Sequence, residues 1–280
     1  MTLLAHGSAT QWPAETVIVT VLAAAAAVVY GVAAHRRRRE PRGWNHWRTL
    51  SFLTGMAIMA LAARPATSPG FDNHMLGHLL IGMFAPLAIV LSAPVTLLLR
   101  SGPPQVGRFV GRILRSSPAH LVTNPIVLLV ANIGGLAALY FSPLFAISQR
   151  SDIVHTAIHI HFFVVGYLFA WLIAGPDPGP GRPGVRVRLV VLGVAIAGHA
   201  VIAQLLYAGA FVAVDAPADE IRAGGTLMYY WGDIAEILLA LALLLTWRPD
   251  HRQTDRPIRP RRSSGISAPA PRLGGAAAAG

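Results

Sequence analysis

The sequence contains no cysteine and no lysine, and only 12% of its 280 residues are charged. Without cysteine, a disulfide framework, a cysteine zinc site, an iron–sulfur centre and a thiol nucleophile are all excluded. The charged fraction is also well below the roughly 25% that is usual in soluble domains. With 54% hydrophobic residues and a mean hydropathy of +0.54, the composition favours an all-α polytopic membrane protein over one or two soluble domains.

Seven apolar stretches are long enough to cross a bilayer as helices, which requires about 17–25 residues each. We expect these helices at Glu15–Ala34, Arg48–Arg64, Asn73–Leu99, Leu121–Phe141, Ile153–Ala174, Leu189–Val214 and Leu227–Trp247. Together they predict a bundle of seven transmembrane helices over residues 15–248, preceded by a short segment, residues 1–14. Residues 249–280 are rich in Pro, Arg, Ser, Gly and Ala, a composition that predicts a disordered tail.

The arginines predict the orientation in the membrane. Twenty of the 23 lie in three loops, 35–48, 100–118 and 175–188, and in the tail after Trp247. Because cytoplasmic loops carry the excess of arginine, we expect the amino end outside and the carboxyl end in the cytoplasm of a multi-pass cell-membrane protein. An odd number of spans requires the same arrangement. Topology and contact with anionic membrane lipid therefore explain the net charge of +11, and no nucleic-acid partner is expected.

Histidines recur at helical spacing where the third and fifth stretches begin. His74 and His78 are spaced i, i+4, and so are His155 and His159. Residues at this spacing share one helix face, and two imidazoles one turn apart are suited to hold a metal ion. The alternative is that each pair is interfacial and bonds water or lipid headgroups. His161 is expected to point elsewhere and to serve packing.

Two carboxylates lie within the seventh stretch. Asp233 and Glu236 are spaced i, i+3, and a carboxylate inside a membrane needs a partner or a proton. They are candidate metal ligands, supports for an imidazole N–H or a proton relay, with a structural bond to another helix as the alternative. His199, alone in the sixth stretch, is expected to be structural. Pro86 has no N–H, so it is expected to kink the third stretch, either opening a small cavity below the first histidine pair or only bending a packed helix.

Three segments resemble a known family. The sequence NHMLGHLLIGMFAPLAIVLSAPVTLLLR (73–100) resembles the signature third span of the multi-spanning CtaG family of cytochrome c oxidase assembly proteins. Residues 155–178 and 224–247 are similar to later blocks of that family, and the resemblance covers about residues 15–248. The family usually has a doubled proline in this span, where Ala85 precedes the proline here. A different assembly factor shares the CtaG name, but it has one span and copper-binding cysteines, and this chain does not resemble it.

The resemblance implies an assembly factor for a terminal haem–copper oxidase that delivers copper to the catalytic subunit. It implies a chaperone, not an enzyme, with cytochrome c oxidase subunits as partners. The sequence contains no nucleophile–base arrangement, phosphate loop or dinucleotide fingerprint. The expected cofactor is copper at an outward-facing site, and its candidate ligands are His74, His78, His155, His159, Asp233 and Glu236.

Two other functions remain open: a haem-binding membrane protein and a metal- or proton-coupled transporter. Axial ligation of haem needs one histidine on each side of the ring, which an i, i+4 pair on one helix does not supply. A transporter needs polar residues that continue to the cytoplasmic face, whereas the inner halves of the predicted helices are almost wholly apolar. Both observations favour the one-sided copper site.

Overall fold

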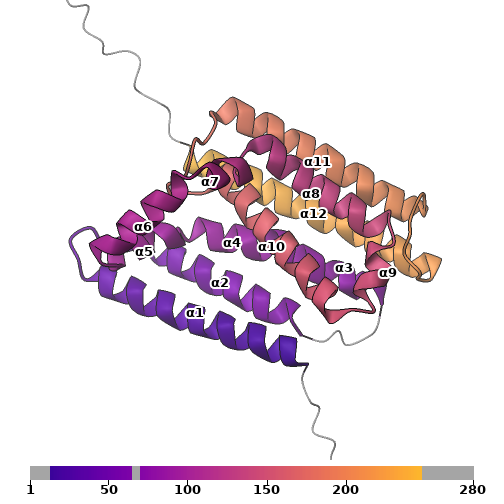
Figure 1. The fold of residues 1–280 in the computed structure, drawn as a ribbon, viewed down its shortest axis with the longest axis horizontal. Helices are drawn as coiled ribbons and strands as arrows, with labels where there is room; N and C mark the ends of the chain where they lie inside the picture. Colours follow the sequence, from indigo (N-terminus) through magenta and orange to yellow (C-terminus); the bar gives the residue numbers. More distant parts are fainter. Residues whose placement is uncertain (1–12, 65–69, 248–280) are drawn as a thin grey trace, which may run out of the picture. The chain divides into compact units, whose positions relative to one another are not determined.

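The computed structural model describes residues 13–64 and 70–247, and every regular element in these ranges is a helix (Figure 1). The long helices are α1 (Ala14–Arg38), α2 (His46–Ala62), α8 (Pro125–Tyr140), α10 (Asp152–Ala174), α11 (Val185–Ala208) and α12 (Ala218–Thr246). A further long helix consists of α3 (Phe71–Leu79), the π-helical turn η1 (Leu80–Phe84) and α4 (Ala85–Leu91). The short helices are α5 (Pro94–Ser101), α6 (Pro104–Leu114), α7 (Ser117–Val122) and α9 (Leu144–Ser148). The predicted all-α class is thus confirmed for these ranges, while the predicted tail, 249–280, lies outside them.

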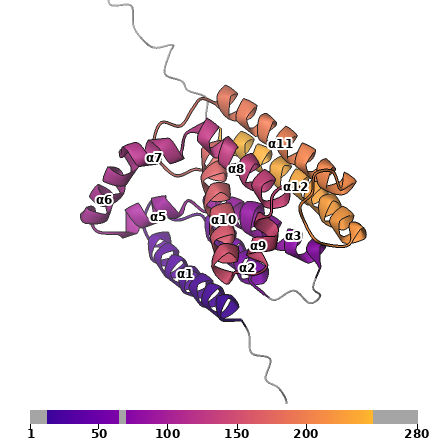
Figure 2. The same cartoon turned by 45° about the vertical axis from the view of Figure 1, so that its right-hand side comes forward.

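The long helices lie side by side (Figures 1 and 2), and their contacts close a ring around the interior of the bundle. Helix α12 packs between α3 and α11, α11 packs between α12 and α8, and α10 packs between α8 and α4, which closes the ring. Helix α2 packs on the outside of α4 and η1, and α1 packs on α2. The candidate ligands of the third, fifth and seventh predicted spans therefore all belong to helices of the ring.

Within residues 13–64 and 70–247, five helical segments are long and apolar enough to cross a membrane: α1, the run from α3 to α4, α10, α11 and α12. Helix α8 has 16 residues and α2 has 17, close to the lower limit of about 17 for a span, so the count of seven stays a prediction. The outer faces of the long helices carry large apolar side chains such as Leu22 and Val190, which are 63% and 65% exposed. Lipid chains, unlike water, solvate such faces.

The third predicted stretch, Asn73–Leu99, is wrong as a single helix. Helix α4 ends at Leu91, Ala93 has a left-handed φ of 54°, and α5 begins at Pro94. The ring of a proline disfavours helical backbone in the preceding residue, and this local effect outweighs the continuous apolar character of the segment. The sixth stretch also ends earlier than expected, at Gly209, whose φ of 66° stops α11.

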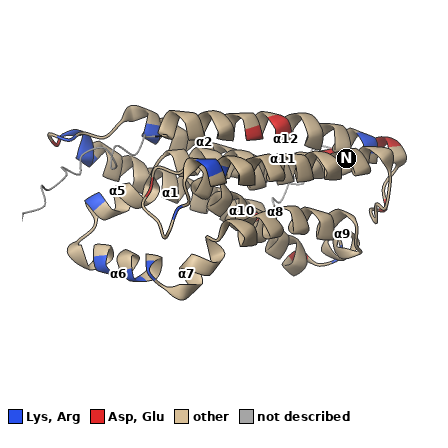
Figure 3. Cartoon of the chain, turned by 90° about the horizontal axis from the view of Figure 1, so that it is seen from above, with Lys and Arg blue, Asp and Glu red and all other residues tan. Residues whose placement is uncertain are grey.

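Arginine-rich segments meet at one end of the bundle. Arg100 of α5 lies 3.6 Å from the carboxylate of Glu40, which follows α1, and it donates to the carbonyl of Gly43 at 3.1 Å. Figure 3 shows further arginines on the nearby α6. The loops 35–48 and 100–118 therefore share one end, as predicted, and the side of the membrane that this end faces remains a prediction.

The loop after α10 is tied to the same end by a buried carboxylate. Asp177, 3% exposed, accepts hydrogen bonds from the backbone N–H of Val95 at 3.0 Å and from the N–H and hydroxyl of Thr96 at 2.7 and 2.5 Å. It thereby caps the first turn of α5, whose N–H groups have no partner within the helix. The Pro94 turn and the loop after α10 are thus held together.

Replacing Asp177 with alanine is expected to destabilise the protein. Loss of a helix N-cap costs about 0.5–2 kcal/mol, and this cap is buried, so we expect a loss near or above about 2 kcal/mol. The midpoint of thermal unfolding in detergent measures it. Asp215→Ala removes an exposed carboxylate and should leave the midpoint unchanged; equal effects of the two substitutions would contradict the capping role.

Candidate metal centre

Four histidines of α3 and α10 come together near the beginnings of these helices. The ring centroids of His74 and His78 are 4.3 Å apart, and those of His155 and His159 are 4.2 Å apart. Across the two helices, His74 lies 5.7 Å from His155 and His78 lies 5.2 Å from His159. Each pair shares a helix face, as its spacing predicts, and the two faces are turned toward each other.

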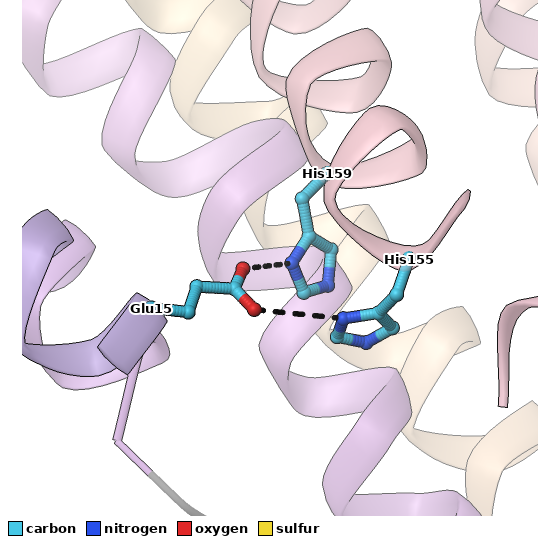
Figure 4. Close-up of side chains that lie close together, drawn as sticks. All are labelled: Glu15, His155 and His159. Carbon is cyan, nitrogen blue, oxygen red and sulfur yellow. Dashed lines mark ion pairs between the residues drawn. The ribbon is translucent and has the colours of Figure 1, made fainter. Parts of the chain in front are cut away.

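A carboxylate from α1 completes this cluster. Glu15 places one oxygen 3.6 Å from Nδ1 of His159 and the other 3.9 Å from Nδ1 of His155 (Figure 4). The ligand atoms of these three residues all lie within 4.8 Å of one another, close enough for one metal ion. Glu15, the first residue of the first predicted span, is not among the ligands that the histidine and carboxylate spacings predict. An acidic residue at the outer edge of an apolar helix was the available signal.

Burial increases from Glu15 toward α3. The side chains of Glu15 and His155 are 40% and 29% exposed, and that of His159 is 20% exposed. His78, in contrast, is a buried residue at 6%. The cluster therefore has an accessible side formed by α1 and α10 and a buried side formed by α3.

Contacts with neighbouring helices hold α3 in register with α10. The backbone N–H of Phe71 donates to Glu220 of α12 at 2.9 Å, which anchors the start of α3. The Tyr140 hydroxyl of α8 lies 3.3 Å from Nδ1 of His78 and 3.3 Å from the sulfur of Met75. Because Nδ1 of His78 is engaged, the other ring nitrogen, Nε2, is the one left for a further ligand.

The π-helical turn η1 packs closely against α10. Pro86 has no N–H to donate to the carbonyl of Gly82. The N–H of Ala85 donates to the carbonyl of Leu80, five residues earlier, which is the π-helical pattern. Gly166 of α10 packs against the Gly82 carbonyl, and a Cβ at residue 166 would lie 1.9 Å from that oxygen. Of the two outcomes left open for Pro86, the structure has a cavity: a space of about 70 Å³ that His78, Gly82 and Gly166 help to line.

The two carboxylates of α12 do not join the outer cluster. Glu236 instead lies deeper in the bundle, with Oε1 3.6 Å from Nδ1 of His199, and Asp233 is half-buried on the same helix. The six predicted ligands therefore do not form a single set around one ion, and His199, expected to be structural, has a carboxylate beside it. His161 points away from the cluster and lies 3.3 Å from the carbonyl of Ala131, in line with its expected packing role.

The donor set of the outer cluster suits a metal ion. Imidazole and carboxylate together bind copper, zinc or iron, so these donors form a candidate metal site that does not select one metal. Glu15 is the one acidic side chain of the Glu15, His155 and His159 group, which favours a cation over an anion.

The helical bundle and this cluster define the class of the protein: a polytopic α-helical membrane protein with a candidate metal site near one end of its helices. Residues 28–250 match the family described as cytochrome c oxidase caa3 assembly factor, and the chain belongs to this family. The family resemblance predicted from the sequence is thereby confirmed. The matched region contains all four clustered histidines but begins after Glu15.

The chain is also similar to longer mycobacterial proteins. It is 32% identical over 251 residues to an uncharacterized protein of Mycobacterium bovis, an alignment that covers 81% of this chain and 38% of the relative. A similar protein of Mycobacterium leprae is 29% identical over 242 residues, covering 78% of this chain and 37% of the relative. The chain thus spans less than two-fifths of the length of these relatives. No solved structure matches it.

Proposed function

We propose that this chain helps to assemble a terminal cytochrome c oxidase by binding copper at Glu15, His155 and His159 and passing it to the catalytic subunit. Family membership supports a role in oxidase assembly. The observation that carries the copper role is the convergence of these three side chains, with ligand atoms within 4.8 Å of one another, beside the rings of His74 and His78.

The geometry of the cluster suits a carrier that must release its ion. Glu15 is 40% exposed and comes from α1, which packs outside the helix ring. An acceptor protein in the membrane can therefore approach the metal from the α1 side. Copper accepts imidazole donors without any cysteine thiolate, which agrees with a chain that contains no cysteine.

The core below the cluster argues against the transporter alternative. Toward the arginine-rich end, the interior consists of apolar side chains from α4, α8, α10, α11 and α12, including Leu87, Leu172 and Leu243. Among the described residues this cluster supplies no ligand for a charged species on its way to the other face. A site that loads and unloads from one side fits this interior better than a conduction path.

The copper role predicts a defect in oxidase maturation when His78 is replaced with alanine. The His78 ring lies between the outer cluster and the cavity, and alanine preserves helix propensity. We expect the copper content and activity of the oxidase to fall roughly tenfold, within the range seen when groups that support metal ligands are lost. Copper analysis of the purified oxidase and its activity in membranes measure the effect at equal levels of this protein.

His161→Ala is the matched control for this experiment. It removes an imidazole from the same region of α10, but this imidazole points away from the cluster. It should leave oxidase copper and activity near the wild-type level. Normal oxidase maturation with His78→Ala at normal abundance would instead support a scaffold that holds oxidase subunits without handling copper.

We further propose that seven helices span the cell membrane with the clustered histidines on its outer side. A reporter fused after Trp247 is then expected to be active only in the cytoplasm, and one inserted between α8 and α10 only outside. The arginine distribution is the reason, since arginine-rich loops stay in the cytoplasm. A fusion at Trp247 that is active outside would invert the model and place the cluster on the cytoplasmic side.

A further inference from the structure

A cavity of about 70 Å³ lies inside the helix ring, below the outer histidine cluster. Helices α8, α10, α11 and α12 and the run from α3 to α4 all contribute to its wall, and Glu15, His155 and His159 are not among the described residues that line it. About 10–15 Å³ of such space holds one water molecule. The cavity therefore has room for an ion together with water.

Three residues that line this cavity, one from each of three helices, carry polar side-chain atoms without partners. His78 Nε2, His199 Nδ1 and Glu236 Oε2 are buried and make no hydrogen bond with a described group, and all three residues line the cavity. They are only 6%, 4% and 6% exposed, respectively. Buried polar groups are costly unless they find partners, so the arrangement indicates a polar or charged occupant.

The charge at the wall favours a cation. Glu236 is the one carboxylate among the described lining residues, and none of them is an arginine. Its Oε1 is 3.6 Å from Nδ1 of His199, beyond hydrogen-bonding distance, so the two groups do not satisfy each other. The His199 ring is held there by Gly232, where a Cβ would lie 2.0 Å from Cε1 of the imidazole.

Thioethers border the same cavity. Met75, Met83 and Met228 also line the cavity. Sulfur and imidazole donors select soft cations, and one carboxylate balances one positive charge. We infer that this cavity is a second metal site, separate from the outer cluster, that takes a soft monovalent cation of the Cu(I) type. The inference deepens the proposed function and rests on it.

His78 connects the two sites. Its ring lies 4.3 Å from that of His74 and 5.2 Å from that of His159, and it also lines the cavity. Toward the arginine-rich end the core is apolar, with Leu172 and Leu243 among its buried residues. An ion that passes His78 therefore meets apolar side chains farther along the bundle, and it leaves by the face through which it entered.

The test is a titration of the purified full-length chain with Ag(I), a redox-inert analogue of Cu(I), followed by elemental analysis and X-ray absorption. We expect wild type to bind two equivalents. The double variant His155→Ala, His159→Ala should keep the inner equivalent, with sulfur among its ligands. The double variant Met75→Leu, Met228→Leu should keep the outer equivalent, with only nitrogen and oxygen ligands. Met59→Leu, remote from the cavity, is the matched control and should behave as wild type.

A separate substitution guards against misfolding of these double variants. Glu236→Gln retains the shape of the side chain and removes its charge. It should lower the affinity of the inner site for Ag(I) by roughly 10–100-fold, the range for lost supporting groups at metal sites. The affinity of the outer site should not change. If the inner equivalent binds equally well to Glu236→Gln, the assigned cavity is wrong.

The outcomes separate the inner site from the proposed function. If wild type binds one equivalent of Ag(I), and replacing His155 and His159 abolishes that binding, the second site is wrong. The outer copper site is then retained. If replacing those two histidines leaves Ag(I) binding unchanged and the bound ion has sulfur ligands, the outer site is wrong instead. Absence of any bound Ag(I) overturns both.

Discussion

Protein in which both His155 and His159 are replaced with alanine is expected to lose its outer copper equivalent, with affinity reduced by 100-fold or more. Loss of groups that only support metal ligands already costs roughly 10–100-fold, and this change removes two of the three clustered donors. Glu15 would then face no imidazole of α10. Copper binding in competition with a Cu(I) chelator, on protein in detergent, measures the loss.

The same variant should remain folded, because alanine is the best helix former and both side chains are partly exposed. Its thermal midpoint should therefore stay close to that of wild type. His161→Ala again serves as the control, with unchanged copper affinity expected. Undiminished outer copper binding by the folded double variant would refute the assignment of the α10 pair as ligands.

Gly166→Ala is expected to produce the largest loss of folded protein among single substitutions at the site. The added Cβ would lie 1.9 Å from the carbonyl oxygen of Gly82 and 2.9 Å from its carbon. These are backbone atoms of η1, so no side chain can rotate away, and α10 must move. Overpacking costs typically about 1–3 kcal/mol, and we expect this contact between backbones to exceed about 3 kcal/mol.

The abundance of the protein in membranes and its thermal midpoint in detergent measure this effect. Gly193→Ala in α11 is the matched control, since a Cβ there meets nothing within 4 Å, and it should be neutral or stabilising by up to about 1 kcal/mol through helix propensity. Equal stability of the two variants would show that α10 and η1 do not pack as closely as described.

Several features of the bundle were predictable because they depend on short-range periodicity. An i, i+4 pair lies on one helix face whatever the helix packs against, so His74 with His78 and His155 with His159 were found as pairs. The effect of Pro86 was predictable for the same reason, because a missing N–H disrupts the helix locally. Hydropathy alone, however, did not locate the break before Pro94, since backbone geometry and not apolar character ends that helix.

The partners of these pairs depend on contacts between distant segments. Glu15 meets His155 and His159 across about 140 residues of sequence because α1 packs along α2 and its first turn lies near α10. Glu236 was expected beside the outer histidines, yet the packing of α12 on α11 sets it against His199. Neither pairing has a signature in local spacing.

By itself, the sequence determined the helical class, the apolar segments with their arginine-rich connections, the family, and the two histidine faces. Each of these follows from composition or from the 3.6-residue period of a helix, which act within a few turns of chain. Only the tertiary structure decided that Glu15 joins the outer cluster and that Glu236 and His199 line a separate cavity. Those outcomes depend on which helix faces pack together, and the close approach of Gly166 to the Gly82 carbonyl, which no local pattern encodes, sets that packing between α10 and η1.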